Sequence, residues 1–537
     1  MTNSGPLTRR TVVVSGLASA AFTVAGAGTA LAQVTAFMQS VAEASSRDKD
    51  VAKFYKANGY KPVWTGKSSK NKSRRQALLK ALDSSANHGL PQAAYDTDAL
   101  RTNLRSVKSE RDLGRIEVQL SQLFLDYARD VQTGILTPSK VDKEIVRAVP
   151  LRGRYETLVN FYKSSPAAYI KQLPPSSAEY NRLMKQKLLM EKSLAKRGWG
   201  PKVPGKKLEP GQSGASVVAL RNRLILMGYL RRNASQTYDA NMQKAVQQFQ
   251  LAHGLNPDGV AGPGTLKEIN VSPQQRLASI IVAMERERWI NMPLGKRHVW
   301  VNLPDFSAQI IDNGKVTFQT RAVIGTNRKD QRSPEFSDVM EHMVINPTWN
   351  VPRSIAVKEY LPMMQKNPNA AGHLTLIDGS GRRVSRQGID FTQFTERTFP
   401  FDLKQPPSRG NALGLVKFMF PNKYNIYLHD TPSKNLFGRE SRAFSHGCIR
   451  LADPFDFAYA LLAKQTRNPE AVFKQHLDTG VESVIPLEKP IPVHLVYRTA
   501  FTSPKGKMNY RRDIYGRDAK IFKALQNAGV VLRSVQS

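Results

Sequence analysis

The sequence predicts a multi-domain α+β protein with a helical N-terminal part, a small three-helix module and a mainly β C-terminal domain. Three observations support this fold class. The chain has 537 residues, which is too long for one hydrophobic core. Apolar residues recur with a helical period through the first part of the chain. From His298 onward the period changes to two, which is typical of strands.

Composition limits the possible partners and cofactors. Lys and Arg number 79 against 43 Asp and Glu, so the formal net charge is +36, which predicts polyanionic surroundings such as nucleic acid, acidic lipid or another anionic polymer. The hydrophobic content of 41% excludes a wholly disordered basic protein. The single Cys excludes an intramolecular disulfide and a Cys-based zinc cluster. No His, Asp and Glu grouping has metal-ligand spacing, so no cofactor is expected.

The first 32 residues have the pattern of a cleavable export signal. Arg9 and Arg10 precede an Ala/Gly/Val-rich stretch that ends at Ala30-Leu31-Ala32, with small residues at the cleavage positions. The paired arginines suggest the twin-arginine route, and an ordinary secretory signal is the alternative. No second long apolar segment follows, so we expect no membrane span in the mature chain. Export makes nucleic acid an unsuitable partner.

Residues 33–200 are predicted to form a helical domain, followed by a Gly/Pro/Lys-rich linker. Two amphipathic runs support this prediction, with apolar residues at helical spacing: Leu78, Leu79 and Leu82, then Leu120, Leu123, Phe124 and Tyr127.

Residues 208–271 are predicted to form a three-helix module with glycine-dependent turns. Its helices are marked by Val217, Leu220 and Leu224, by Ala245, Val246 and Phe249, and by the start signal Gly262-Pro263-Gly264.

Residues 296–537 are predicted to form a mainly β domain. Strand signals lie at 298–303, 307–311, 316–318, 321–325, 339–345, 416–420, 425–428 and 491–497, with a hairpin turn at Asp312-Asn313-Gly314-Lys315. The polar insertion at about 353–412 is about 60 residues long, too long for a plain hairpin loop. We expect it to form a lid over a site.

The only Cys, Cys448, lies in Ser445-His446-Gly447-Cys448-Ile449-Arg450. A buried structural Cys is the alternative. In extended chain, alternation would place the side chains of His446, Cys448 and Arg450 on one side, where the cationic neighbours favour the thiolate. A turn at Gly447 would aim the N–H groups of 446–448 at one point, as an oxyanion hole needs. His429 ends an apolar strand and is the expected general base or imidazolium partner.

These residues resemble the catalytic motif of the L,D-transpeptidase (YkuD) family, a His dipeptide followed by Ser-His-Gly-Cys-x-Arg. Further segments look like a large Gram-negative subclass of that family: 346–352, 411–418, 427–432 and 513–518. The 208–271 module resembles the peptidoglycan-binding module of cell-wall enzymes. The resemblance therefore implies a helical scaffold, a peptidoglycan-binding-like domain and a catalytic domain with an inserted lid.

The resemblance also assigns roles to individual residues. Cys448 is the nucleophile and His429 the catalytic histidine, whose ring the backbone carbonyl of Asp430 orients. His446 and Gly447 complete the oxyanion hole with Cys448. The remaining assignments are motif support by Arg450 and substrate contacts by Tyr427, Trp349 and Ser445.

The implied reaction is a two-step acyl transfer on peptidoglycan in the periplasm. The thiolate attacks the L-centre carbonyl of diaminopimelate at position 3 of a tetrapeptide stem, D-Ala leaves, and the amine of a second stem forms a 3→3 cross-link. The implied partners are stem peptides, glycan and carbapenem-type inhibitors. Water or a lipoprotein amine is an alternative acceptor, which would make a carboxypeptidase, an endopeptidase or an anchoring enzyme. A non-catalytic wall-binding scaffold is the alternative from another class.

Overall fold

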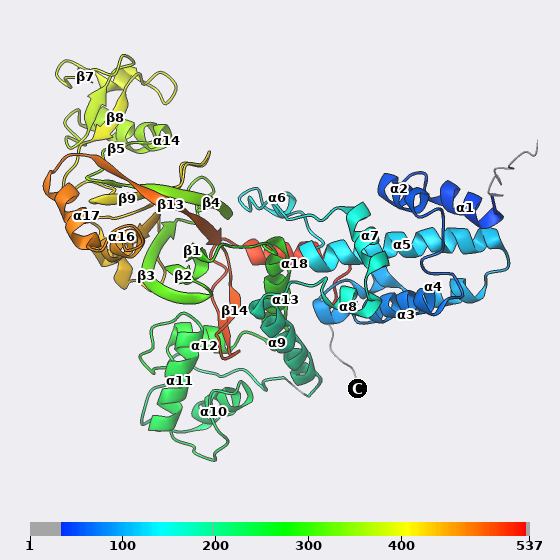
Figure 1. The fold of residues 1–537 in the computed structure, drawn as a ribbon. Coiled ribbons are helices and arrows are strands. Elements are labelled where there is room, and N and C mark those ends of the chain that lie inside the picture. The colour runs from blue at the N-terminus through cyan, green and yellow to red at the C-terminus, as the bar shows by residue number, and fades with distance from the viewer. Residues whose placement is uncertain (1–33, 197, 533–537) are drawn as a thin grey trace, which may run out of the picture.

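The computed structural model describes residues 34–196 and 198–532, and the expected export signal at 1–32 lies outside them. Helices from the N-terminal part of the chain lie at one end of the molecule, and the large sheet lies toward the other (Figure 1). The three-helix module lies beside the sheet domain. The predicted multi-domain α+β fold class is confirmed.

The N-terminal part is helical, and its longest helix organises its core. Helix α5 (Glu110–Thr133) begins at a capping box made by Ser109 and Asp112, and it buries Leu120, Phe124 and Tyr127. The other helices are α1 (Ala36–Ser45), α2 (Lys49–Ala57), α3 (Ser69–Asp83), α4 (Thr97–Arg105), α6 (Pro138–Val141), α7 (Arg154–Lys163), α8 (Pro166–Lys171) and α9 (Ala178–Ala195). The two amphipathic runs of the sequence therefore lie on α3 and α5.

The module consists of α10 (Ala215–Leu226), α11 (Ala240–Ala252) and α12 (Pro263–Ile269), which share one hydrophobic core. Gly214 precedes α10 with φ of 114°, a conformation that favours glycine. Next comes α13 (Pro273–Trp289), a helix that the sequence patterns above do not include. It packs against α9 and α18 (Arg517–Asn527), so it connects the N-terminal helices with the C-terminal end of the chain.

A nine-stranded mixed sheet forms the centre of the C-terminal domain, with strand order β11-β3-β12-β10-β9-β4-β13-β1-β2. Its strands are β1 (Arg297–Asn302), β2 (Ser307–Asp312), β3 (Lys315–Gly325), β4 (Phe336–Ile345), β9 (Val416–Met419), β10 (Leu428–His429), β11 (Ala443–Ser445), β12 (Ile449–Leu451) and β13 (Ser483–Val496). The strand predicted at 425–428 is shorter than expected. Asn425 has φ of 53°, outside the strand region, so pairing begins only at Leu428.

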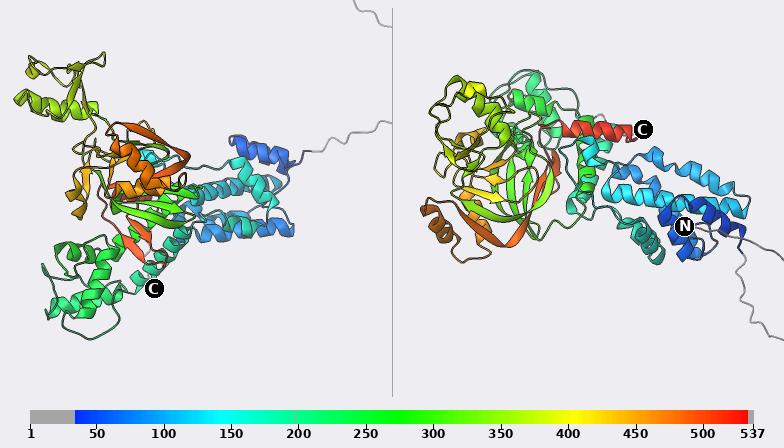
Figure 2. Two further views of the ribbon diagram at one scale, coloured as in Figure 1. Left: turned by 60° about the vertical axis from the view of Figure 1, so that its left-hand side comes forward. Right: turned by 90° about the horizontal axis from the view of Figure 1, so that it is seen from above.

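The segment between β4 and β9 forms a separate small layer. It contains the four-stranded sheet β5 (Trp349–Asn350), β8 (Asp402–Gln405), β6 (Thr375–Ile377) and β7 (Arg383–Val384), with helices α14 (Arg353–Ile355) and α15 (Leu361–Lys366). These elements share their own apolar cluster. We call this segment the insertion. Figure 2 shows it in yellow-green, standing away from the large sheet.

Several C-terminal elements carry no clear signal in the sequence. Helices α16 (Pro454–Leu462) and α17 (Pro469–Asp478) follow β12, and the hairpin of β14 (Ala500–Thr502) and β15 (Met508–Tyr510) follows β13. A search of the described helices finds none that is both long and apolar enough to cross a membrane.

Candidate active site

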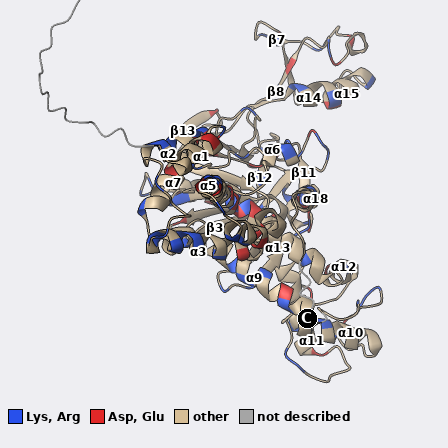
Figure 3. Cartoon of the chain, turned by 90° about the vertical axis from the view of Figure 1, so that its right-hand side faces the viewer, with Lys and Arg blue, Asp and Glu red and all other residues tan. Residues whose placement is uncertain are grey.

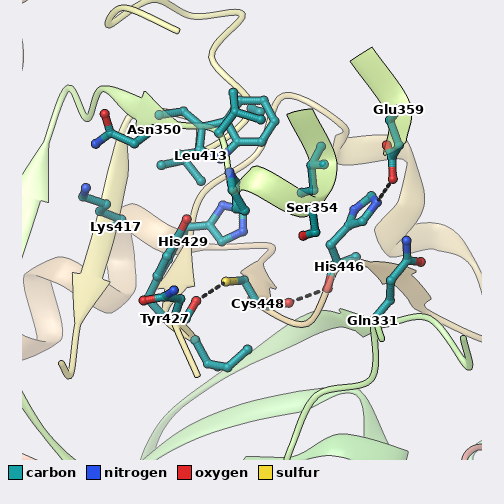
Figure 4. A pocket seen from close by; sticks show the side chains of 18 of the residues that line it. Gln331, Asn350, Ser354, Glu359, Leu413, Lys417, Tyr427, His429, His446 and Cys448 are labelled. Atoms are coloured by element: carbon teal, nitrogen blue, oxygen red, sulfur yellow. Dashed lines mark hydrogen bonds and ion pairs between the residues drawn. The ribbon is translucent and has the colours of Figure 1, made fainter. Parts of the chain in front are cut away.

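The predicted nucleophile lies in a tight turn between β11 and β12. Gly447 has φ of 117°, so this position favours glycine, and Ile426 packs close to it. The turn breaks the extended alternation that the sequence suggested for His446, Cys448 and Arg450. The His446 imidazole points instead to the insertion, where its Nε2 lies 2.6 Å from a carboxylate oxygen of Glu359 (Figure 4).

Ser445 uses its hydroxyl inside this turn. Its Oγ donates to the Cys448 carbonyl at 2.5 Å and accepts the Gly447 N–H at 3.2 Å. The hydroxyl is therefore engaged in the turn, which does not favour the predicted substrate contact. The Gly447 N–H already donates to Ser445, so the expected oxyanion hole has at most two of its three predicted donors. For the N–H groups of His446 and Cys448, the described chain offers no hydrogen-bond acceptor.

Ser333 anchors the same turn from below, and no sequence pattern identified it. Its buried Oγ donates to the Gly447 carbonyl at 2.6 Å and accepts the Gly325 N–H at 3.0 Å. In a trans peptide the carbonyl and the following N–H point in opposite directions. Because Ser333 holds the Gly447 carbonyl, the Cys448 N–H points away from Ser333.

A pocket of about 690 Å³ collects most of the predicted site residues. Its wall includes Cys448, His429, His446, Ser445, Tyr427, Trp349 and Arg450, together with Lys417 and Glu359. Figure 4 shows the side chains of His429, Tyr427 and Cys448 close to one another. Trp349 is buried against the core of the insertion, so it also belongs to that core.

His429 is held as a neutral imidazole. Its Nδ1 lies 2.5 Å from the Asp430 carbonyl oxygen, which can only accept, so in the neutral ring Nδ1 carries the proton. The Leu413 backbone is a second hydrogen-bond partner of the ring. Burial, with a further contribution from Arg450, lowers the pKa of His429 to about 3. At neutral pH the ring is therefore a proton acceptor and not an imidazolium.

The Cys448 thiol is also neutral. Burial raises the pKa of Cys448 to about 11, and this outweighs the opposite effects of hydrogen bonds from Tyr427 and the charge of Arg450. The expectation that cationic neighbours would favour the thiolate is therefore wrong for this state. The Sγ atom donates to the Asn425 carbonyl at 3.3 Å (Figure 4). Within residues 34–196 and 198–532, no hydrogen bond joins Cys448 to His429, so proton transfer requires the thiol to reorient.

The resemblance implied that Arg450 supports the motif, but its side chain forms no hydrogen bond with any described residue. Its Nε is buried without a partner, and no ion pair of its guanidinium occurs among the described residues. It lines the pocket beside Cys448 and His429 instead.

Domain models match three parts of the chain. A scaffold domain matches residues 49–186, a putative peptidoglycan binding domain matches 213–269, and the L,D-transpeptidase catalytic domain (YkuD) matches 296–471. The chain carries an L,D-transpeptidase catalytic domain. Within this L,D-transpeptidase domain lie the Cys448 turn, His429 and the whole pocket wall.

Individual proteins are similar to parts of the chain. A putative L,D-transpeptidase of Haemophilus influenzae is 30% identical over 274 residues, and these cover 51% of this chain and 53% of that protein. The chain thus spans about half the length of this relative. The L,D-transpeptidase structure from Xylanimonas cellulosilytica is 15% identical, with 55% of this chain and 100% of that chain covered and a TM-score of 0.17. The L,D-transpeptidase structure from Stackebrandtia nassauensis is 14% identical, with 55% of this chain and 97% of that chain covered and a TM-score of 0.22.

Proposed function

We propose that this protein is a cysteine-dependent L,D-transpeptidase acting on the tetrapeptide stems of peptidoglycan. The observation that carries the proposal is the arrangement of three groups in one L,D-transpeptidase domain. Cys448 and a neutral His429 share the pocket, and the turn that carries Cys448 leaves two N–H groups without acceptors. A nucleophile, a base and an oxyanion site are the parts that acyl transfer needs.

In the first step, the thiol proton of Cys448 passes to Nε2 of His429, and Sγ attacks the L-centre carbonyl of diaminopimelate. The N–H groups of Cys448 and His446 stabilise the oxyanion of the tetrahedral intermediate. The carbon–nitrogen bond then breaks, and the D-Ala amine leaves with the proton that His429 returns. The product is a thioester between the stem and Cys448.

In the second step, the side-chain amine of another stem attacks the thioester. A carbon–nitrogen bond forms, the carbon–sulfur bond breaks, and His429 carries the proton back to Sγ. The result is a 3→3 cross-link and the free thiol. Tyr427 assists both steps because its hydroxyl hydrogen-bonds with Cys448 and stabilises negative charge on sulfur.

The envelope is the location that suits this reaction. The match of 213–269 to a putative peptidoglycan binding domain and the expected export signal both support the periplasm. Lys and Arg residues lie over many elements, with a run along α3 (Figure 3). This broad positive charge suits a polymer whose stems carry carboxylates. Carbapenems, as acylating agents, are expected to modify the same thiol.

The test is to incubate the purified protein with disaccharide-tetrapeptide and to follow D-Ala release and cross-linked dimers. We expect both products from the wild type and neither from Cys448→Ala. His429→Ala should lose at least about 100-fold in rate, because general base catalysis contributes about 10²–10⁴-fold. Release of D-Ala without dimers would indicate water as the acceptor and a carboxypeptidase. Release of D-Ala by Cys448→Ala would refute the proposal, and its absence in the wild type would favour a non-catalytic scaffold.

A further inference from the structure

Three polar residues form a row across adjacent strands in the wall of the pocket. His429 on β10 pairs directly with Lys417 on β9 and with Arg450 on β12. Residues that pair directly across strands project from the same face of a sheet. All three line the same pocket as Cys448, so two cations flank the proposed base. Figure 4 shows Lys417 on the side of His429 opposite His446.

Neither cation has a carboxylate partner. Arg450 forms no ion pair with any described residue, and its Nε is buried without a hydrogen bond. Lys417 likewise forms no ion pair within the described ranges, although Glu482 attracts it from a distance. By contrast, Lys358 in the same wall pairs with Asp330 at 3.2 Å. Both side chains are partly buried, so an anion that enters the pocket would find two cations that have no carboxylate partner in the described chain.

We propose that Arg450 and Lys417 form a binding site for a carboxylate of the acyl-donor stem, on the side of His429. This proposal rests on the proposed function and names the chemistry that the site selects. A guanidinium binds a carboxylate through two parallel hydrogen bonds, which also fixes its orientation. Two carboxylates lie near the scissile bond: that of the terminal D-Ala and that of the diaminopimelate side chain.

The electrostatics of His429 support a role in the reaction. Both Arg450 and Lys417 lower the pKa of this imidazole, after the larger effect of burial. A carboxylate bound between the two cations offsets part of their charge. The proton affinity of His429 then rises when the acyl donor is present, which favours transfer of the thiol proton at that moment.

A different role for Arg450 predicts a different pattern. Its charge also lowers the pKa of Cys448, so Arg450 could act only by stabilising the thiolate. In that case its removal would slow acylation by every donor to the same extent. A carboxylate site instead predicts that its removal affects only those donors that carry the bound carboxylate. The ratio between donors therefore separates the two roles.

The experiment measures kcat/KM of D-Ala release for three stems: unmodified, amidated at the D-Ala carboxylate, and amidated at the diaminopimelate side chain. For the wild type, one amidation should lower kcat/KM by about 10–100-fold, the loss of one hydrogen bond between charged groups. Its position identifies the bound carboxylate. Arg450→Gln should lower kcat/KM for the unmodified stem by a similar factor. The ratio of kcat/KM for the unmodified stem to that for the amidated stem should then be close to one. Lys417→Gln should reduce the ratio, and Arg450→Lys should retain part of it.

Lys358→Gln is the matched control because it removes a wall cation that already has a partner, and the ratio should stay at the wild-type value. Circular dichroism and thermal unfolding check that each variant is folded. If Arg450→Gln and Lys417→Gln both keep the wild-type ratio, the carboxylate site is refuted while the proposed function stands. If the wild type distinguishes none of the stems, the site is also refuted. If the wild type releases D-Ala from no stem, the proposed function itself fails.

Discussion

At the scale of single residues, the free site holds both Cys448 and His429 in their neutral forms. Burial raises the pKa of Cys448 and lowers that of His429, so thiol and imidazole are both neutral at pH 7. In the proposed mechanism, the thiol must turn from the Asn425 carbonyl before its proton can pass to His429. A neutral thiol is a weaker nucleophile than a thiolate.

This arrangement predicts the pH dependence of alkylation by iodoacetamide. A raised pKa means that the thiolate fraction is small at neutral pH and grows as pH rises toward about 11. The alkylation rate of the free protein should therefore increase about tenfold per pH unit from pH 7 to pH 10, without a plateau. Cys448→Ala gives the background rate. A plateau below pH 8 would indicate a preformed thiolate and contradict this account.

The sequence predicted some residues of the site better than others. Cys448, His429 and Asp430 lie within two short motifs, and the structure brings them to one pocket or its edge. Ser333 and Lys417 carried no signal because their contacts come from segments distant in the sequence. The sequence shows the cations near Cys448 but not the burial that outweighs their effect on its pKa, so the expected thiolate is absent.

At the scale of elements, the turn between β11 and β12 depends on its support. Ser333 holds both the Gly447 carbonyl and the Gly325 N–H, and Tyr515 Oη donates to the Gly325 carbonyl at 2.6 Å. These bonds fix the peptide whose N–H we assign to the oxyanion hole. We therefore regard Ser333 as a positioning residue.

Ser333→Ala tests this support. The change leaves a buried donor and a buried acceptor unpaired, which costs about 1–3 kcal/mol for each group. We expect a lower unfolding temperature and a lower kcat, with KM little changed because the pocket wall stays in place. Thermal unfolding and steady-state kinetics measure the two effects. A higher KM with an unchanged kcat would contradict the assignment of Ser333 as a positioning residue.

The insertion contacts the turn through Glu359 and His446. Both side chains are partly exposed, so the pair contributes about 0.2–1 kcal/mol. Glu359→Gln should therefore change the unfolding temperature little. It should increase hydrogen exchange in residues 353–366, because one link between the insertion and the catalytic turn is weakened. Unchanged exchange in this segment would show that other contacts hold it.

At the scale of the whole molecule, a buried ionic network joins distant parts of the chain. Arg286 of α13 pairs with Glu335 at 2.5 Å and with Asp518 of α18 at 2.9 Å. Arg517 pairs with Glu335 at 3.3 Å and with Glu144 of the N-terminal part at 3.0 Å. Arg517 also donates to the Ser333 carbonyl at 2.9 Å, so the network reaches the support of the catalytic turn.

Removing Arg517 should therefore affect stability and catalysis together. Arg517→Met removes one of the two arginine partners of the buried Glu335 and a partner of the partly exposed Glu144, and breaking a buried pair costs about 3–5 kcal/mol. We expect a clear fall in the unfolding temperature and slower acylation. Arg382→Met is the control, because its pair with Asp378 is exposed and should matter by less than about 1 kcal/mol. Equal effects of the two substitutions would contradict a role for the network.

The sequence predicted the fold class because periodicity distinguishes the helical and β parts clearly. It predicted neither α13 nor the hairpin of β14 and β15. The charged residues of α13, including Arg286 and Arg288, look solvent-exposed in sequence but are buried in ion pairs. The same helix buries Leu277, Ile280, Ile281 and Met284 at helical spacing, so its apolar signal was present in the sequence, followed by a charged run that is typical of an exposed segment.

The central claim is that Cys448 becomes acylated by the stem peptide. Intact-protein mass spectrometry of the full chain, quenched in acid during turnover of the tetrapeptide stem, tests it most directly. We expect a mass increase equal to the stem without D-Ala, located on Cys448 by peptide mapping and missing from Cys448→Ala. Turnover of the stem with an unmodified Cys448, or with equal rate in Cys448→Ala, would contradict it.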